Sequence, residues 1–205
     1  MTWSRRRVLK AGGALAGASA AGLLMGTARS QAAPGSDDAA SNPVAARGQG
    51  AEHRVEVPKR IALLNLHTDE RLDIEYCREG AYLPQALSAI EVLLRDFRTG
   101  ERHAIDPRLM DYLFEVARTS SVEPKFSVIS GYRSPLTNAR LHEHGAEVVQ
   151  HSLHMEGRAI DVRMSGVDCA SLAAHALGLK GGGVGYYRAS DFVHLDTGRF
   201  RSWKG

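Results

Sequence analysis

The first 33 residues have the composition of an export signal, so only the later part of the chain is available to fold. The basic stretch SRRRVLK at 4–10 precedes small and apolar residues at 11–25, and Ala32-Ala33 forms a small-residue cleavage site. This pattern is typical of a secretory signal, and the paired arginines favour the twin-arginine route. The 15-residue apolar run contains four glycines and is too short to span a bilayer, which needs about 20 residues.

The rest of the chain is slightly acidic, although the whole chain has a formal charge of +3 and a pI near 9.0. Residues 1–33 hold five cations and no acid, which leaves 21 Lys and Arg against 23 Asp and Glu in the remainder. A nucleic-acid-binding protein keeps its basic surface on the folded domain. We therefore expect no nucleic-acid partner, and no stable membrane span after processing.

Three segments follow from this pattern: a twin-arginine signal peptide at 1–33, a disordered linker at 34–53 and one folded domain at 54–205. The linker is rich in Ala, Gly, Ser, Asn and Gln, a composition typical of a disordered segment. The domain that follows has about 150 residues, which is enough to form one hydrophobic core. We expect export through the twin-arginine machinery and a periplasmic location. Cys77 and Cys169 are the only cysteines, and they fit either a disulfide permitted by export or two buried thiols.

Hydrophobic spacing predicts an α+β fold for the domain, with a small antiparallel sheet flanked by helices. Asp106-Pro107 has the pattern of an N-cap followed by proline at the first helical position. Strands are expected at 60–66, 72–76, 126–130, 159–163, 185–187 and 192–196, and helices at 83–97, 107–117, 134–141 and 168–179.

Two short stretches hold the residue types of a metal site: SLHMEGRAID at 152–161 and DFVHLD at 191–196. His154 precedes a glycine turn and Asp161 lies on the strand beyond it, so the turn can bring both side chains to one centre. His194 lies on the last expected strand, which can pair beside Asp161. Catalytic zinc commonly takes three ligands from His and Asp or Glu, and the chain has no cysteine cluster as an alternative.

The surrounding carboxylates allow two assignments of a general base. Asp191 lies three residues before His194, where it can take a proton from water without binding the metal. Asp196 lies two residues after His194 on the same strand face, so it either competes for this role or holds the imidazole from behind. Isolated histidines are more often surface or core residues than metal ligands. The spacing of these residues alone therefore does not decide whether they form a zinc site.

The motif S-x-H-x-x-G-x-A-x-D, followed by D-x-x-H, resembles the zinc metallopeptidase family of D-Ala-D-Ala carboxypeptidases and dipeptidases, whose fold is shared with Hedgehog signalling domains. The resemblance spans about residues 60–203 and is closest to the murein endopeptidase K branch. Further matching motifs are SGYRSP at 130–135, GGVGYY at 182–187 and FVHLDTG at 192–198. The resemblance implies the same fold and Zn²⁺ as cofactor.

Position by position, the resemblance implies zinc ligands at His154, Asp161 and His194. Asp191 corresponds to the acidic residue that activates the water in relatives. Arg133 corresponds to an arginine that holds substrate oxygen or stabilises the oxyanion, a task that suits the fixed donors of a guanidinium.

Two further residues near these motifs have predicted supporting roles. Tyr132 is expected to contact substrate beside Arg133, with burial in the core as the alternative. Ser152 is expected to orient the His154 turn, because no general base is evident that would make it a nucleophile.

The resemblance implies a murein endopeptidase that hydrolyses peptidoglycan cross-links between stem peptides, such as a bond between two diaminopimelates. A carboxypeptidase or dipeptidase that trims D-Ala-terminated peptides would share every metal residue. An inactive peptidoglycan-binding module would also retain zinc, although Asp191 argues against it because such a module needs no base.

Overall fold

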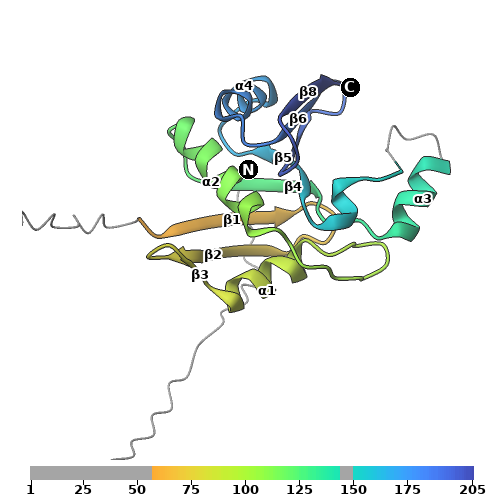
Figure 1. Cartoon of the computed structure of the whole chain (residues 1–205), viewed down its shortest axis with the longest axis horizontal. Helices are drawn as coiled ribbons and strands as arrows, with labels where there is room; N and C mark the ends of the chain where they lie inside the picture. The colour runs from red at the N-terminus through yellow and green to blue at the C-terminus, as the bar shows by residue number, and fades with distance from the viewer. Residues whose placement is uncertain (1–56, 144–149) are drawn as a thin grey trace, which may run out of the picture. The chain divides into compact units, whose positions relative to one another are not determined.

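A computed structural model describes residues 57–143 and 150–205 (Figure 1). The predicted signal peptide at 1–33 and linker at 34–53 lie outside these residues and stay predictions. In the described part of the chain, no helix has both the length and the apolar character needed to cross a membrane.

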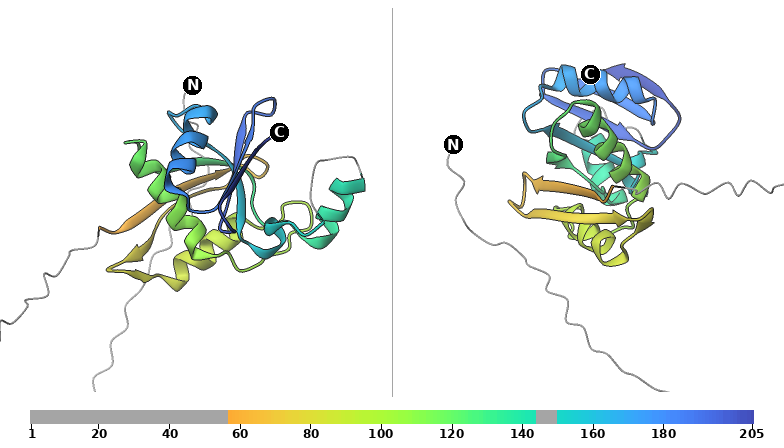
Figure 2. Two further views of the ribbon diagram at one scale, coloured as in Figure 1. Left: turned by 45° about the horizontal axis from the view of Figure 1, so that its top comes forward. Right: turned by 90° about the vertical axis from the view of Figure 1, so that its left-hand side faces the viewer.

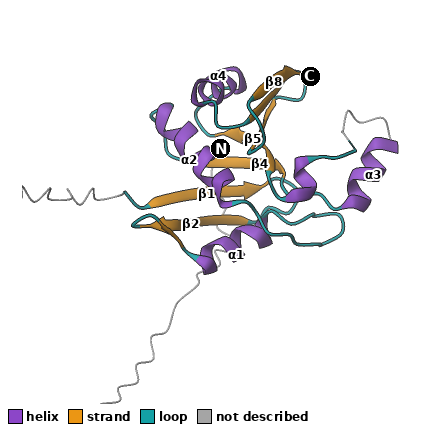
Figure 3. Ribbon diagram, viewed as in Figure 1, coloured by secondary structure: helices purple, strands orange, loops and turns teal. Residues whose placement is uncertain are grey.

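The described elements form one eight-stranded sheet with four α-helices and one 3₁₀ turn (Figure 3). The strands are β1 (Lys59–Asn65), β2 (Arg71–Arg78), β3 (Ala81–Tyr82), β4 (Lys125–Ser130), β5 (Ala159–Met164), β6 (Gly183–Tyr187), β7 (Phe192–Asp196) and β8 (Arg201–Lys204). The helices are α1 (Pro84–Leu93), α2 (Pro107–Thr119), α3 (Pro135–Glu143), η1 (Leu153–Glu156) and α4 (Cys169–Leu179).

The strands lie in the order β3-β2-β1-β4-β5-β7-β6-β8. The α+β class is confirmed, but the sheet is larger than predicted and mixed rather than wholly antiparallel. β1 pairs in parallel with β4 because the chain crosses over through α1 and α2, and β8 pairs in parallel with β6. Local hydrophobic spacing carries no information on either pairing, and the four-residue β8 was not predicted.

One face of the sheet is covered by α2 and α4, which lie together on the same side of the strands (Figure 2, left). Side chains alternate between the two faces of a strand. On β5 and β7, the side chains that join the helices in the core are fully buried: Ile160, Val162, Val193 and Leu195. The intervening Asp161 and His194 therefore belong to the opposite face.

The helix ends follow the predicted capping chemistry with one exception. The side chain of Asp106 caps α2 by accepting from the Arg108 N–H, and Pro107 opens the helix as predicted. The predicted helix at 83–97 ends at Leu93, because the Leu94 carbonyl accepts a hydrogen bond from the Tyr132 N–H at 2.8 Å. This contact fastens the end of α1 to the segment after β4.

The two cysteines lie on different elements, Cys77 in β2 and Cys169 at the start of α4. Both side chains are buried and both thiols are free. The structure therefore contains the two buried thiols rather than the disulfide.

Leu113 on α2 provides a test of the core, because its side chain is fully buried. We expect Leu113→Ala to lower the free energy of unfolding by about 3–5 kcal/mol, since the truncation leaves a cavity. Leu136→Ala, at a side chain that is 52% exposed, should change it by less than about 0.5 kcal/mol. Urea unfolding followed by circular dichroism measures both; equal effects would contradict the packing described here.

Candidate metal centre

Asp161 and His194 face each other across the central ladder of the sheet. β5 and β7 pair antiparallel, and their register places Asp161 directly opposite His194. His154 reaches the same point from η1, which immediately precedes β5. The Ser152 side chain caps this turn by accepting from the His154 N–H. Gly157 ends it at φ 65°, where a Cβ would overlap the Ala104 carbonyl.

The three side chains bring one ligand atom each to a common point. His154 Nε2 lies 3.2 Å from His194 Nδ1, and Asp161 Oδ1 lies 2.9 Å from His194 Nδ1 and 3.3 Å from His154 Nε2. A tetrahedral ion with ligand bonds of about 2.0–2.1 Å needs ligand atoms about 3.3–3.4 Å apart. Among the described residues, this is the group whose donor atoms converge in the manner of a metal site.

Hydrogen bonds behind both imidazoles fix which nitrogen faces inward. His154 Nδ1 donates to the Gly131 carbonyl at 2.7 Å, which leaves Nε2 with its lone pair toward the cluster. His194 Nε2 lies 3.1 Å from the Asp196 carboxylate, so it donates there and Nδ1 faces inward. Such partners behind a histidine orient the ring and raise its basicity as a ligand.

The electrostatics of the cluster favour a cation at its centre. Burial lowers the pKa of His154. Burial acts the same way on His194, but hydrogen bonds with Asp161 and Asp196 outweigh it and raise the pKa of that ring. Although burial opposes ionisation of Asp161, the two histidines hold its pKa well below the usual range. The carboxylate therefore stays charged, and a metal ion would satisfy all three inward-facing acceptors.

Asp196 is wholly inaccessible to solvent and acts as the support of His194. Its Oδ2 accepts from Arg201 at 2.7 Å and from His194, and its Oδ1 accepts from the Gly183 and Gly198 N–H groups and from Arg201. With both oxygens committed, this carboxylate is poorly suited to take a proton from water.

Arg133 lies beside the cluster, as the sequence predicted for a substrate-binding side chain. Its Nη2 is 3.6 Å from Asp161 Oδ2, and its side chain is 9% exposed. Burial lowers the pKa of the guanidinium, and Asp161 opposes this effect. Its Nε is buried and has no hydrogen-bond partner among the described residues. A buried donor without a partner is costly, so the Arg133 Nε–H is an unsatisfied polar group beside the cluster.

The segment that carries Arg133 is held by residues that the sequence analysis did not identify. Asp96, after α1, accepts from both the N–H and the hydroxyl of Ser134, at 3.0 and 2.6 Å. Gly131 packs so closely on Leu94 that a Cβ there would lie 2.6 Å from the Leu94 carbonyl oxygen. Aspartate and glycine are common in most sequences, so neither Asp96 nor Gly131 could be recognised from the sequence as a support of this segment.

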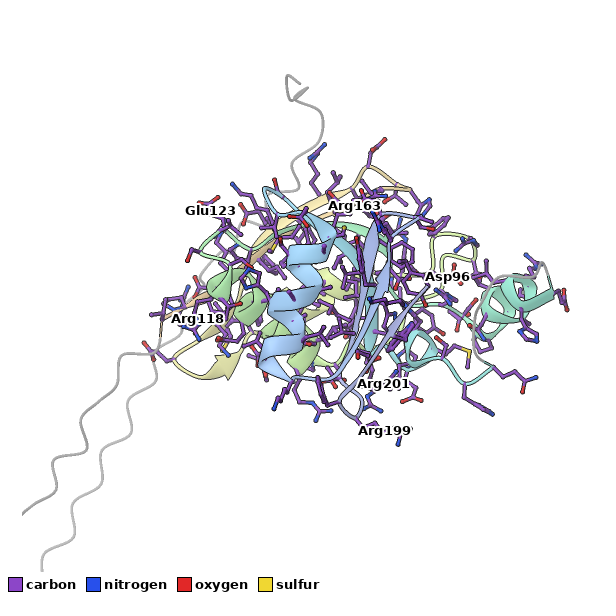
Figure 4. All side chains as sticks on the ribbon, turned by 90° about the horizontal axis from the view of Figure 1, so that it is seen from above. Asp96, Arg118, Glu123, Arg163, Arg199 and Arg201 are labelled. Carbon is purple, nitrogen blue, oxygen red and sulfur yellow. The ribbon has the colours of Figure 1, made fainter. Side chains whose placement is uncertain are left out.

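The structure does not bring Asp191 to the three ligands. Asp191 adopts φ 51° immediately before β7, its side chain is 71% exposed, and its carboxylate pairs with Arg163 at 3.1 Å. Figure 4 shows Arg163 and Arg201 at opposite ends of the last strands, and His194 lies in β7 between their partners Asp191 and Asp196.

Tyr132 is placed in the core rather than on an open groove. Its side chain is buried, its hydroxyl donates to Glu101 at 2.9 Å, and its ring stacks on His103. In this conformation its hydroxyl fastens the loop between α1 and α2.

The chain is similar to a group of known peptidases over the whole region that forms this site. The family model described as peptidoglycan L,D-endopeptidase MepK matches residues 53–203. The chain is 37% identical over 149 residues to the probable peptidoglycan L,D-endopeptidase MepK of Haemophilus influenzae, which covers 72% of this chain and 80% of that protein. It is 36% identical over 146 residues to the Escherichia coli K12 and Shigella flexneri enzymes of that name, covering 71% of this chain and 80% of each. No solved structure matches the chain.

Asp196→Asn tests the support behind His194. We expect it to weaken binding of Zn²⁺ about 10–100-fold, because an amide cannot replace both charged oxygens that hold His194 and Arg201. Competition with a chromophoric chelator measures this affinity, and circular dichroism checks that the variant is folded. Asp191→Asn is the matched control and should leave the affinity unchanged; equal affinities in both folded variants would show that Asp196 does not support the ligand.

Proposed function

Because the chain belongs to the peptidoglycan L,D-endopeptidase MepK family of M15 peptidases, we propose that it is an exported, zinc-dependent murein endopeptidase. Its substrate would be the peptide cross-link between two stem peptides of peptidoglycan. The observation that carries the proposal is the convergence of His154, Asp161 and His194 at 2.9–3.3 Å. The M15 family is generally metal-dependent, which agrees with this arrangement.

Zinc is the metal that best suits the donor set. Two imidazole nitrogens and one carboxylate oxygen form a common set of protein ligands at catalytic zinc, which keeps a further position open. Two of the three separations between the donor atoms, 3.2 and 3.3 Å, are close to those of a tetrahedral ion, and the third, between Asp161 Oδ1 and His194 Nδ1, is shorter at 2.9 Å. When bound, zinc would supply a Lewis acid that activates water and polarises the scissile carbonyl.

Arg133 supplies positive charge next to this centre. Its Nε is buried and unpartnered, and its Nη2 lies near Asp161 Oδ2. A guanidinium held in this way can bind the carbonyl oxygen as negative charge develops on it, with no cost of reorganisation during the reaction. Asp96 and Ser134 keep the segment in place.

Asp191 remains our proposed general base. It is exposed, so a carboxylate released from Arg163 could take the proton of the attacking water and return it to the leaving amine. Asp196, the alternative base, has both oxygens committed to hydrogen bonds with His194, Arg201 and the backbone. We therefore assign Asp196 to positioning and Asp191 to proton transfer.

We also propose the cellular route and the finer fold relationship from the sequence. Residues 1–33 would direct the chain to the twin-arginine machinery, and residues 34–53 would link the signal to the domain. The mature protein would act in the periplasm, where its peptidoglycan substrate lies. The fold is proposed to be that of the D-Ala-D-Ala peptidases and Hedgehog domains, in a version with an eight-stranded mixed sheet.

Digestion of defined cross-linked muropeptides tests the function. We expect the purified protein to release single stem peptides, to lose this activity with a chelator, and to regain it with Zn²⁺. His154→Ala should be inactive, because it removes a metal ligand, whereas His175→Ala on α4 should retain activity. Product masses identify the bond. Release of only terminal D-Ala would favour the carboxypeptidase alternative, and binding of peptidoglycan without any cleavage would favour the inactive module.

Asp191→Asn tests the base. We expect kcat to fall about 10²–10⁴-fold while the zinc content stays that of the wild type, because the side chain transfers a proton without binding the metal. Steady-state kinetics and metal analysis of the same preparation measure the two effects. An unchanged kcat would remove Asp191 from the mechanism.

A further inference from the structure

The phenol of Tyr187 lies on the same face of the sheet as the three proposed metal ligands. β6 pairs with β7 so that Gly185 lies opposite His194, and Tyr187 lies opposite Phe192. Residues that face each other across an antiparallel ladder share a face, as do residues two apart on one strand. Tyr187 is therefore on the side of His194, and the neighbouring Tyr186 packs against the core on the other side.

Trp203 on β8 lies next to both the Tyr187 hydroxyl and His194. Its indole Nε1 donates to the Tyr187 hydroxyl oxygen at 3.0 Å. The indole ring lies 5.2 Å from the His194 imidazole, with the Arg201 guanidinium 4.9 Å away. Gly185 makes this possible, because a Cβ there would overlap the indole. One side chain thus contacts both the phenol and a proposed ligand.

The phenol ring has little freedom to turn away. It stacks on Phe192 with ring centroids 4.5 Å apart and an interplanar angle of 13°. Gly205 packs against one edge of the Tyr187 ring, so closely that a Cβ on this residue would overlap the ring. The position of the hydroxyl is therefore fixed before any substrate binds.

The Tyr187 hydroxyl has a proton to give. An indole N–H is only a donor, so the Tyr187 oxygen accepts from Trp203 and its own O–H must point elsewhere. Among the described residues, no hydrogen-bond acceptor meets this O–H. A hydroxyl that already accepts a hydrogen bond becomes a better donor.

Arg133 and Tyr187 both lie on the face of the sheet that carries the proposed ligands. Arg133 Nη2 is 3.6 Å from Asp161 Oδ2, and Tyr187 is joined to His194 through Trp203. The Arg133 Nε–H and the Tyr187 O–H are both donors without an acceptor among the described residues. Zinc peptidases stabilise the negative charge that develops on the scissile carbonyl oxygen, and donors placed in advance serve this purpose.

We propose that Tyr187 is a catalytic residue whose hydroxyl donates a hydrogen bond to the scissile carbonyl oxygen as its negative charge develops, and that Trp203 positions it. This inference rests on the proposed endopeptidase function. The proton stays on the phenol throughout, so Tyr187 neither gains nor loses charge. Arg133 and Tyr187 would hold the oxygen as a pair of donors.

Tyr187→Phe tests the proposal, because it removes the hydroxyl and keeps the ring stacked on Phe192. We expect kcat on a cross-linked muropeptide to fall about 10²-fold with KM little changed, since the hydrogen bond strengthens only in the transition state. Tyr186→Phe is the matched control on the opposite face and should match the wild type. Trp203→Phe, which loses the N–H but keeps an aromatic ring, should show a smaller fall in kcat.

Binding of a phosphinate analogue of the cross-link gives a second readout, because its charged oxygens imitate the oxyanion. Its inhibition constant should rise in Tyr187→Phe by about the same factor as kcat falls. An unchanged kcat, or a raised KM with unchanged kcat, would overturn the proposal. If the wild type cleaves no muropeptide, the proposed function fails, and the affinities of both proteins for the phosphinate, measured by calorimetry, still decide whether the hydroxyl binds such an oxygen.

Discussion

The antiparallel pairing of β5 with β7 is the constraint on which the rest of the site depends. Its register places Asp161 opposite His194, and the same alternation sends Ile160, Val162 and Val193 into the core under α2 and α4. A shift of one residue would move the ligands into the core and the core residues to the open face. The hydrophobic effect therefore holds the metal-binding register through core residues on the face opposite the ligands.

The second element of the site is a segment held from a distant part of the chain. Asp96, after α1, is almost fully buried. Although burial alone would raise its pKa, hydrogen bonds from Ser134 and from the Arg98 backbone lower it to about 2. The resulting permanent negative charge anchors the turn that offers the Gly131 carbonyl to His154 and carries Arg133. An aspartate from the N-terminal half of the domain thus anchors a segment of the site whose ligands all come from the C-terminal half.

The sequence predicted what depends on local periodicity and on motifs, and missed what depends on long-range pairing. The helix caps and the strands carrying Asp161 and His194 follow from short-range chemistry. The parallel pairing of β1 with β4 joins segments separated by two helices, which no local pattern encodes. Tyr132 illustrates another limit, since spacing does not tell whether an aromatic ring faces a groove or the core, and the structure places it in the core.

The order of the site residues along the chain has a consequence for biosynthesis. Asp96 precedes the segment that carries Arg133, and the three ligands follow in the order His154, Asp161 and His194. The strand that supports His194 comes later still, because Arg201 and Trp203 lie on β8. A ribosome exposes the chain in this same order. The metal centre can therefore be completed only after β8 has left the ribosome, whereas the anchor at Asp96 is available before the ligands that depend on it.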